Sequence, residues 1–123
     1  MIKIIIADDN KLIRDSLKKF LQSEKDFNIV AESDSPDEIV ELIKTVDADI
    51  LLLDFQFPNK NGMEILKEVK SVNPDLNVII LSMHLEEKYA SNAMKLGAKG
   101  YITKDADPII IIDTIKNIFE LNC

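Results

Sequence analysis

The chain alternates five times between a short apolar run and a longer segment with helical periodicity. Continuous apolar runs at 4–7, 50–53 and 78–81 are typical of strands buried on both faces. Shorter strand candidates lie at 28–32 and 100–102. Apolar residues three and four positions apart predict helices around 13–21, 36–43, 65–69, 86–96 and 108–121.

Local signals mark where several of these helices begin and end. The segment 35–38, Ser-Pro-Asp-Glu, has the form of a capping box with proline at the first helical position. Asn73-Pro74 ends the third helical pattern, and Gly97 follows the fourth, where a left-handed cap favours glycine. The helices are therefore expected as five separate elements.

Strands that alternate with amphipathic helices favour a parallel sheet with helices on both faces. Crossover connections between parallel strands are almost always right-handed. We therefore expect an α/β fold with a doubly wound five-stranded parallel sheet, flavodoxin-like with (βα)5 topology. The 123 residues suit a single domain, 1–123, and no linker or repeat divides them.

Composition narrows the classes of function. The chain has 22 acidic and 15 basic residues and a net charge of −7, which disfavours binding to nucleic acid by this chain itself. Its one cysteine, Cys123, excludes an internal disulfide and favours a reducing compartment. With no run of 18 apolar residues and no signal-peptide pattern, we expect a cytoplasmic protein that does not enter membranes.

Polar residues follow four of the predicted strands. Asp8 and Asp9 follow the first strand along the chain, Asp54 the third, Ser82 the fourth and Lys104 the fifth. In doubly wound sheets, ligands bind beyond the carboxyl ends of the strands. The simpler alternatives are a helix cap at Asp9 or Asn10, another at Ser82, and a solvated lysine at 104.

Three clustered carboxylates repel one another unless a cation neutralises them. Oxygen ligands alone suit a hard ion such as Mg²⁺, which keeps several waters and takes few protein carboxylates. Zinc is disfavoured because the chain has one histidine, His84, and one cysteine. Lys104 and Ser82 could bind phosphate oxygens that the metal leaves uncovered.

These residues resemble the receiver domain of two-component response regulators over essentially the whole chain. The resemblance rests on Asp8-Asp9, on the segment DFQFPNKNG at 54–62, on Ser82 and on Lys104, each at a strand end and at the family's spacing. The segment GAKGYITKD at 97–105 is similar to the NarL/FixJ type, whose receivers precede a helix-turn-helix DNA-binding domain.

The resemblance implies a role for each of these residues. Asp54 would accept a phosphoryl group from the phosphohistidine of a sensor histidine kinase. Asp8, Asp9, Asp54 and the backbone carbonyl of Gln56 would hold Mg²⁺. No enzyme activity is expected beyond self-catalysed phosphoryl transfer to Asp54 and slow autodephosphorylation.

The resemblance also implies a conformational switch. Ser82 would move toward the phosphoryl group and Tyr101 would rotate into the space it leaves. Gln56 and His84 occupy positions that tune loss of the phosphoryl group in the family. Asp105 stands where many receivers have proline, which leaves the geometry of the Lys104–Asp105 peptide bond open.

The last helix begins with four successive isoleucines, 109–112, which exceed the buried stripe of one helix. At least one should face outward, and we expect Ile109 or Ile110 in a partner surface, either for a homodimer formed on phosphorylation or for an output domain. Such a C-terminal helix-turn-helix domain, which would bind DNA and regulate transcription, is expected to be absent from this chain. Coverage of these isoleucines by the domain itself is an equal alternative.

Two rival functions remain open. A phosphatase with an aspartyl-phosphate intermediate would need a second acid two residues after its nucleophile, where Gln56 stands. A phosphorylation-independent pseudo-receiver that acts only as an interaction module would be expected to lack one of the acids or the lysine. All five positions are filled here.

Overall fold

A computed structural model describes residues 1–83 and 87–120 of the chain. Five strands form one sheet: β1 (Ile2–Ala7), β2 (Phe27–Ser33), β3 (Ile50–Asp54), β6 (Asn77–Ser82) and β7 (Gly100–Thr103). They lie in the order β2-β1-β3-β6-β7, and every neighbouring pair is parallel. The expected doubly wound, flavodoxin-like fold is confirmed.

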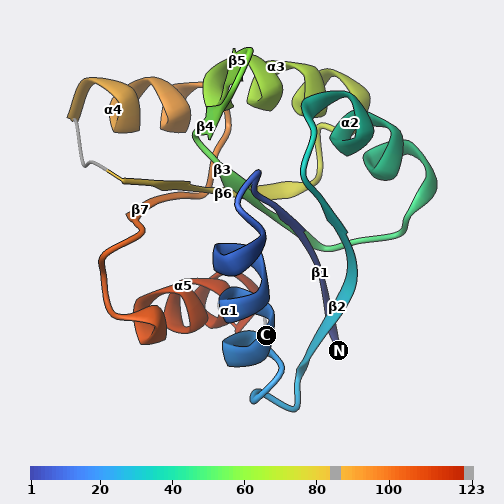
Figure 1. Cartoon of the computed structure of the whole chain (residues 1–123), viewed down its shortest axis with the longest axis vertical. Coiled ribbons are helices and arrows are strands. Elements are labelled where there is room, and N and C mark those ends of the chain that lie inside the picture. Colours follow the sequence, from blue (N-terminus) through green and yellow to red (C-terminus); the bar gives the residue numbers. More distant parts are fainter. Residues whose placement is uncertain (84–86, 121–123) are drawn as a thin grey trace.

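Five helices cover the two faces of this sheet: α1 (Lys11–Leu21), α2 (Pro36–Thr45), α3 (Gly62–Val72), α4 (Glu87–Lys95) and α5 (Pro108–Glu120). Helices α1 and α5 lie on one face, and α2, α3 and α4 lie on the other (Figure 1). In the part of the chain that the structure describes, no helix combines the length and apolarity needed to cross a membrane.

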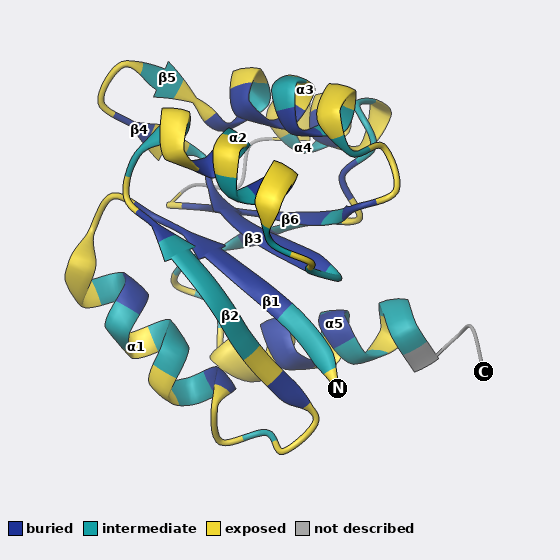
Figure 2. Cartoon of the chain, turned by 90° about the vertical axis from the view of Figure 1, so that its right-hand side faces the viewer, coloured by how far each residue is buried: buried dark blue, intermediate teal, exposed yellow. Residues whose placement is uncertain are grey.

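The pleat of each strand divides its side chains between two cores. Ile4 and Ile6 of β1 pack in the core beneath α1 and α5, whereas Ile5 and Ala7 pack in the core beneath α2, α3 and α4. Both cores are buried, so β1 and β3 are dark along most of their length in Figure 2. This two-sided burial explains the continuous apolar runs in the sequence.

Polar side chains cap the first two helices of the chain. Asn10 accepts from the amides of Leu12 and Ile13 at the start of α1. Ser35 accepts from the amide of Glu38 at the start of α2, as one half of the predicted capping box requires. Because Asn10 is the cap of α1, neither Asp8 nor Asp9 is needed for that purpose.

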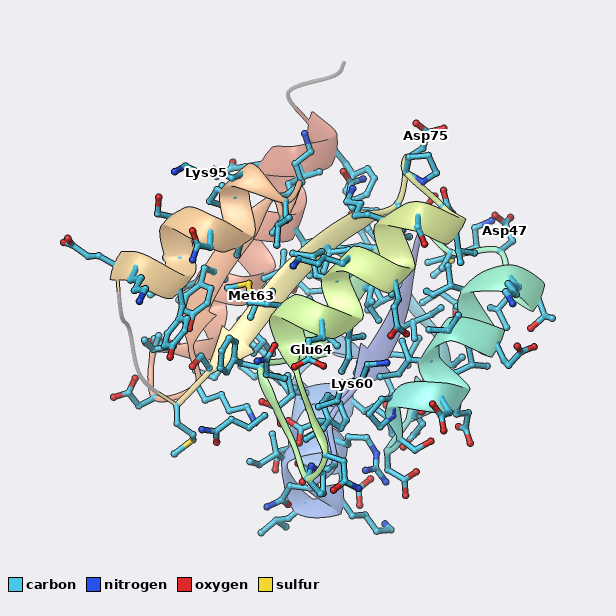
Figure 3. All side chains as sticks on the ribbon, turned by 90° about the horizontal axis from the view of Figure 1, so that it is seen from above. Asp47, Lys60, Met63, Glu64, Asp75 and Lys95 are labelled. Atoms are coloured by element: carbon cyan, nitrogen blue, oxygen red, sulfur yellow. The ribbon has the colours of Figure 1, made fainter. Side chains whose placement is uncertain are left out.

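The loop after β3 contains a small hairpin that the hydrophobic pattern did not predict. Strands β4 (Gln56–Phe57) and β5 (Lys60–Asn61) pair antiparallel, and Asn61 then caps α3. Lys60 forms an ion pair with Glu68 of α3 and so ties the hairpin to that helix. Figure 3 shows α3 from above, with Lys60 labelled.

Two glycines have positions that only glycine fits well. A Cβ on Gly62 would lie 2.8 Å from the Cα of Phe55, so the start of α3 can approach β3 only without a side chain there. Gly97 has a φ of 104°, the left-handed conformation expected after α4.

Candidate functional site

The predicted site residues converge at the carboxyl edge of the sheet. Because the strands are parallel, β1, β3, β6 and β7 deliver Asp8, Asp54, Ser82 and Lys104 to the same edge. Asp8 is 1% exposed, Asp54 3% and Ser82 4%, whereas Asp9 is exposed. The edge therefore holds buried polar groups next to one accessible acid.

The three aspartates form an oxygen-rich cluster. One carboxylate oxygen of each of Asp8, Asp9 and Asp54 lies within 4.8 Å of the others. The ammonium group of Lys104 lies 2.9 Å from Oδ2 of Asp8 and 3.0 Å from Oδ1 of Asp54. One ammonium cannot balance three carboxylates, so the cluster keeps an excess of negative charge.

The donor set fits a hard divalent cation such as Mg²⁺. Oδ2 of Asp8 is fully buried and accepts no hydrogen bond of good geometry from the described residues, although Lys104 provides a nearby countercharge. Because Lys104 also pairs with Asp54, it offsets only part of the negative charge at this buried oxygen, and a second cation there would lower the cost of burying it. The residues present could therefore hold a metal ion.

The pKa values of two buried groups reflect this crowding. Burial raises the pKa of Asp54 from 3.8 to about 6, and the charge of Asp8 adds to that rise, against hydrogen bonds from Lys104 and the amide of Gln56. Burial alone would lower the pKa of Lys104, but the carboxylates of Asp8 and Asp54, 2.9 and 3.0 Å from its ammonium group, outweigh burial and raise that pKa above its usual value.

Backbone contacts fix the side chains that carry this charge. The amide of Asn10 donates to Oδ1 of Asp8 at 2.9 Å, and the amide of Gln56 donates to Oδ1 of Asp54 at 3.2 Å. The amide of Lys104 donates to the carbonyl of Ser82 at 2.7 Å, which brings the end of β7 to the site. Each contact lies at a strand end, where the chain leaves the sheet.

A cleft of about 430 Å³ opens at the cluster. Asp9, Asp54 and Lys104 line it together with Gln56 and the apolar side chain of Phe57. A buried carboxylate that borders a solvent-accessible cleft, with a lysine 3.0 Å away, can meet a small charged substrate.

The predicted switch residue belongs to an aromatic group. Tyr101 is partly buried, and its ring meets the edge of Phe55, which directly follows Asp54, with centroids 6.4 Å apart. Phe55 also contacts Tyr89 of α4, with centroids 5.1 Å apart. The sequence analysis did not single out Phe55 or Tyr89. The one available signal was that Phe55 directly follows Asp54.

Three further predictions concern His84, the isoleucine run and the Lys104–Asp105 peptide bond. His84 lies outside the described residues. The prediction that the isoleucine run faces partly outward is confirmed, since Ile109 is 47% exposed and Ile110 44%. The Lys104–Asp105 peptide bond is trans, as are all peptide bonds in the described ranges.

Arg14 is a further residue near the site that the sequence analysis did not single out. Arg14 is buried on α1, and its guanidinium group donates to the backbone carbonyl of Asp8. It occupies the same stripe of α1 as Leu17 and Leu21, and a charged residue in an apolar stripe was the signal that could have revealed it.

Comparison with known proteins assigns the family. Residues 4–116 match the family model of the response regulator receiver domain. The chain belongs to this family. The receiver domain predicted from the strand-end residues is thereby confirmed, and the alternation of strands and helices is explained over nearly the whole chain.

The receiver domain is similar to transcriptional regulators. It is 35% identical over 119 residues to the transcriptional regulatory protein DegU of Brevibacillus brevis, covering 97% of this chain and 50% of that protein. It is 27% identical over 120 residues to the response regulator UvrY of Escherichia coli K12, covering 98% and 55%. The chain spans about half the length of these curated relatives.

Solved structures agree with the fold. A two-component response regulator of the LuxR family from Aurantimonas sp. SI85-9A1 superposes with a TM-score of 0.90 at 26% identity, covering 94% of this chain and 83% of that one. The signal receiver domain of the putative response regulator NarL from Mycobacterium tuberculosis superposes with a TM-score of 0.87 at 27% identity. The match covers 95% of this chain and 94% of that one. These relatives agree with the NarL/FixJ type indicated by segment 97–105.

Proposed function

We propose that this receiver domain is activated by phosphorylation of Asp54 and that a sensor histidine kinase is the donor. The observation that carries the proposal is the Asp54 carboxylate, which is 3% exposed, borders the cleft and lies 3.0 Å from Lys104. A buried aspartate with a matched cation at the edge of a cleft is suited to nucleophilic work.

Each residue has one task in the transfer. Oδ1 of Asp54 is held by Lys104 and by the amide of Gln56, so Oδ2 attacks the phosphorus. The new O–P bond forms as the N–P bond to the donor histidine breaks, and the imidazole leaves. Lys104 and the Ser82 hydroxyl then bind oxygens of the phosphoryl group, which stabilises the charge that develops there.

Asp8, Asp9 and Asp54 would hold Mg²⁺ together with the backbone carbonyl of Gln56. The metal supplies neutralisation of the phosphoryl oxygens as the donor enters. Asp9 is the exposed member of the cluster and Asp8 the buried one, so Asp9 would be the ligand on the solvent side of a bound ion.

Phosphorylation would alter the surface through which the domain contacts its partners. A phosphoryl group brings about −1.5 to −2 charges to the site, and inward movement of Ser82 makes room for Tyr101. The face of α4, β7 and α5, with exposed Ile109 and Ile110, would then favour a homodimer or an output domain. A DNA-binding output domain, controlled by this receiver domain, would regulate transcription. The protein would act in the cytoplasm.

Intact-mass spectrometry after incubation with Mg²⁺ and acetyl phosphate tests the proposal against its rivals. We expect a lasting increment of one phosphoryl group, which needs Mg²⁺ and is lost in Asp54→Asn because an amide is a poor nucleophile. Rapid turnover of acetyl phosphate without a lasting increment would instead indicate a phosphatase. An unchanged mass would indicate a pseudo-receiver.

A further inference from the structure

Arg14 is the only arginine among the 15 basic residues of the chain, and it is buried. It lies on α1, on the side that faces the sheet, and its side chain is 11% exposed. Burial of a cation costs free energy unless its donors are matched. The one guanidinium group of the chain therefore lies where burial of a positive charge costs most.

Two acceptors match this group. Nη1 donates to the backbone carbonyl of Asp8 at 2.7 Å, and Nε donates to Oε1 of Glu32 on β2 at 3.1 Å. Glu32 also pairs with Lys18, one turn further along α1. Arg14 thus connects the loop after β1 to the neighbouring edge strand.

The carbonyl that Arg14 holds belongs to the peptide bond between Asp8 and Asp9. Rotation of this peptide would move both carboxylates that follow β1. The carboxylate of Asp8 is held separately by the amide of Asn10, so the side chain and the main chain of Asp8 each have their own anchor.

Lysine could not replace Arg14 in this arrangement. A guanidinium group presents several donors in a planar fork, whereas an ammonium group is a compact point charge. The two acceptors lie on different segments, β2 and the loop after β1, and are met by different nitrogens of the same fork. The geometry requires the shape of arginine as well as its charge.

We propose that Arg14 is a positioning residue for the metal site and holds the Asp8–Asp9 peptide so that both carboxylates can bind one Mg²⁺. This inference rests on the proposed function. Partners that orient metal ligands from outside the coordination shell typically change metal affinity by about tenfold to a hundredfold when mutated. Arg14 is such a partner acting through the main chain.

The test is the affinity for Mg²⁺, measured by calorimetry on the unphosphorylated protein. If Arg14 acted only through its charge, its removal would change this affinity in the opposite direction from that expected for a positioning residue. Removal of a cation near the site should strengthen Mg²⁺ binding by charge alone. Loss of positioning should weaken it. We expect Arg14→Met to bind Mg²⁺ about tenfold to a hundredfold more weakly than wild type.

Lys18→Met is the matched control, because it removes one positive charge from the same network and leaves both contacts of Arg14 in place. It should bind Mg²⁺ as wild type does, or slightly more tightly. The free energy of unfolding without Mg²⁺, measured for each variant, separates a loss of stability from a loss of affinity among folded molecules.

Arg14→Met with wild-type or tighter affinity would overturn the inference, whatever its stability. If Arg14→Met does not fold, Arg14→Lys decides: it keeps the charge and loses the fork, so weaker binding supports the inference and wild-type affinity overturns it. A wild-type protein that binds no Mg²⁺ would overturn the metal site itself, and this inference with it, so the two failures are distinguishable.

Discussion

At the scale of single residues, the site contains buried charges that lower the stability of the fold. Asp8 and Asp54 are both buried, and one lysine lies between them. Burial of Asp54 raises its pKa to about 6, so at neutral pH without metal the carboxylate is ionised against the preference of the fold. Removal of that charge should therefore stabilise the protein.

We expect Asp54→Asn to raise the free energy of unfolding at pH 7 without Mg²⁺ by about 1–3 kcal/mol, since a shift of about two pKa units corresponds to about 3 kcal/mol. Between about pH 4 and pH 6 the folded state binds more protons than the unfolded state, so wild-type stability falls as the pH rises through that window. The advantage of the variant should vanish below about pH 4.

Urea unfolding over a pH series measures this effect. Asp26→Asn is a suitable control, because Asp26 is exposed and precedes β2 at the opposite edge of the sheet. It should leave the stability difference between pH 4 and pH 7 unchanged. An Asp54→Asn variant less stable than wild type at pH 7 would show that Lys104 already compensates the buried charge.

Some of these residues could be predicted from sequence and others could not. Asp54 could be predicted because it ends a continuous apolar run, and parallel strands end at one edge. Arg14 could not be assigned a role, because its partner is a backbone carbonyl and the pairing depends on how α1 packs. Phe55 was missed because its ring contacts come from distant segments.

At the scale of elements, the connection from β3 to α3 controls the position of Asp54. The amide of Gly62 donates to the carbonyl of Phe55 at 2.6 Å, so the first residue of α3 lies against the residue that follows Asp54. The hairpin between them escaped prediction because strands of two residues are too short to show a periodic pattern.

Gly62→Ala should therefore destabilise the domain by about 1–3 kcal/mol and slow labelling of Asp54 by acetyl phosphate. Its Cβ would meet the Cα of Phe55 at 2.8 Å, and backbone cannot move aside as a flexible side chain can. Urea unfolding and the rate of mass increase measure the two effects.

Gly100→Ala is the matched control for this variant. A Cβ there would lie 3.5 Å from side-chain carbons of Ile79 and Thr114, which is ordinary contact, and β7 should accept it. If the two alanine variants were equally stable and were labelled by acetyl phosphate at the same rate, the close approach at Gly62 would not constrain the site.

At the scale of the whole molecule, the proposed phosphorylation of buried Asp54 would have to change an exposed surface. The path that we propose runs from Asp54 to Phe55, whose ring contacts Tyr101 of β7 and Tyr89 of α4. The exposed isoleucines lie at the start of α5, the next element after β7. The sequence could predict that these isoleucines exceed one helical stripe, but the identity of any partner depends on the surface of another molecule.

Ile110→Glu should abolish phosphorylation-dependent self-association, because it places a charge in the apolar surface at the start of α5. Sedimentation of acetyl-phosphate-treated protein measures the change. Val72→Glu, on the exposed end of α3, is the control and should associate as wild type does. Unchanged association and partner binding in Ile110→Glu would count against the interface.

The most direct test of the central claim is to locate the phosphoryl group on the chain. The protein is incubated with Mg²⁺ and acetyl phosphate, reduced with borohydride, which converts an aspartyl phosphate to homoserine, and sequenced by tandem mass spectrometry. We predict homoserine at position 54 and at no other aspartate. Homoserine at Asp8 or Asp9, or a reduced chain with every aspartate intact, would contradict the account.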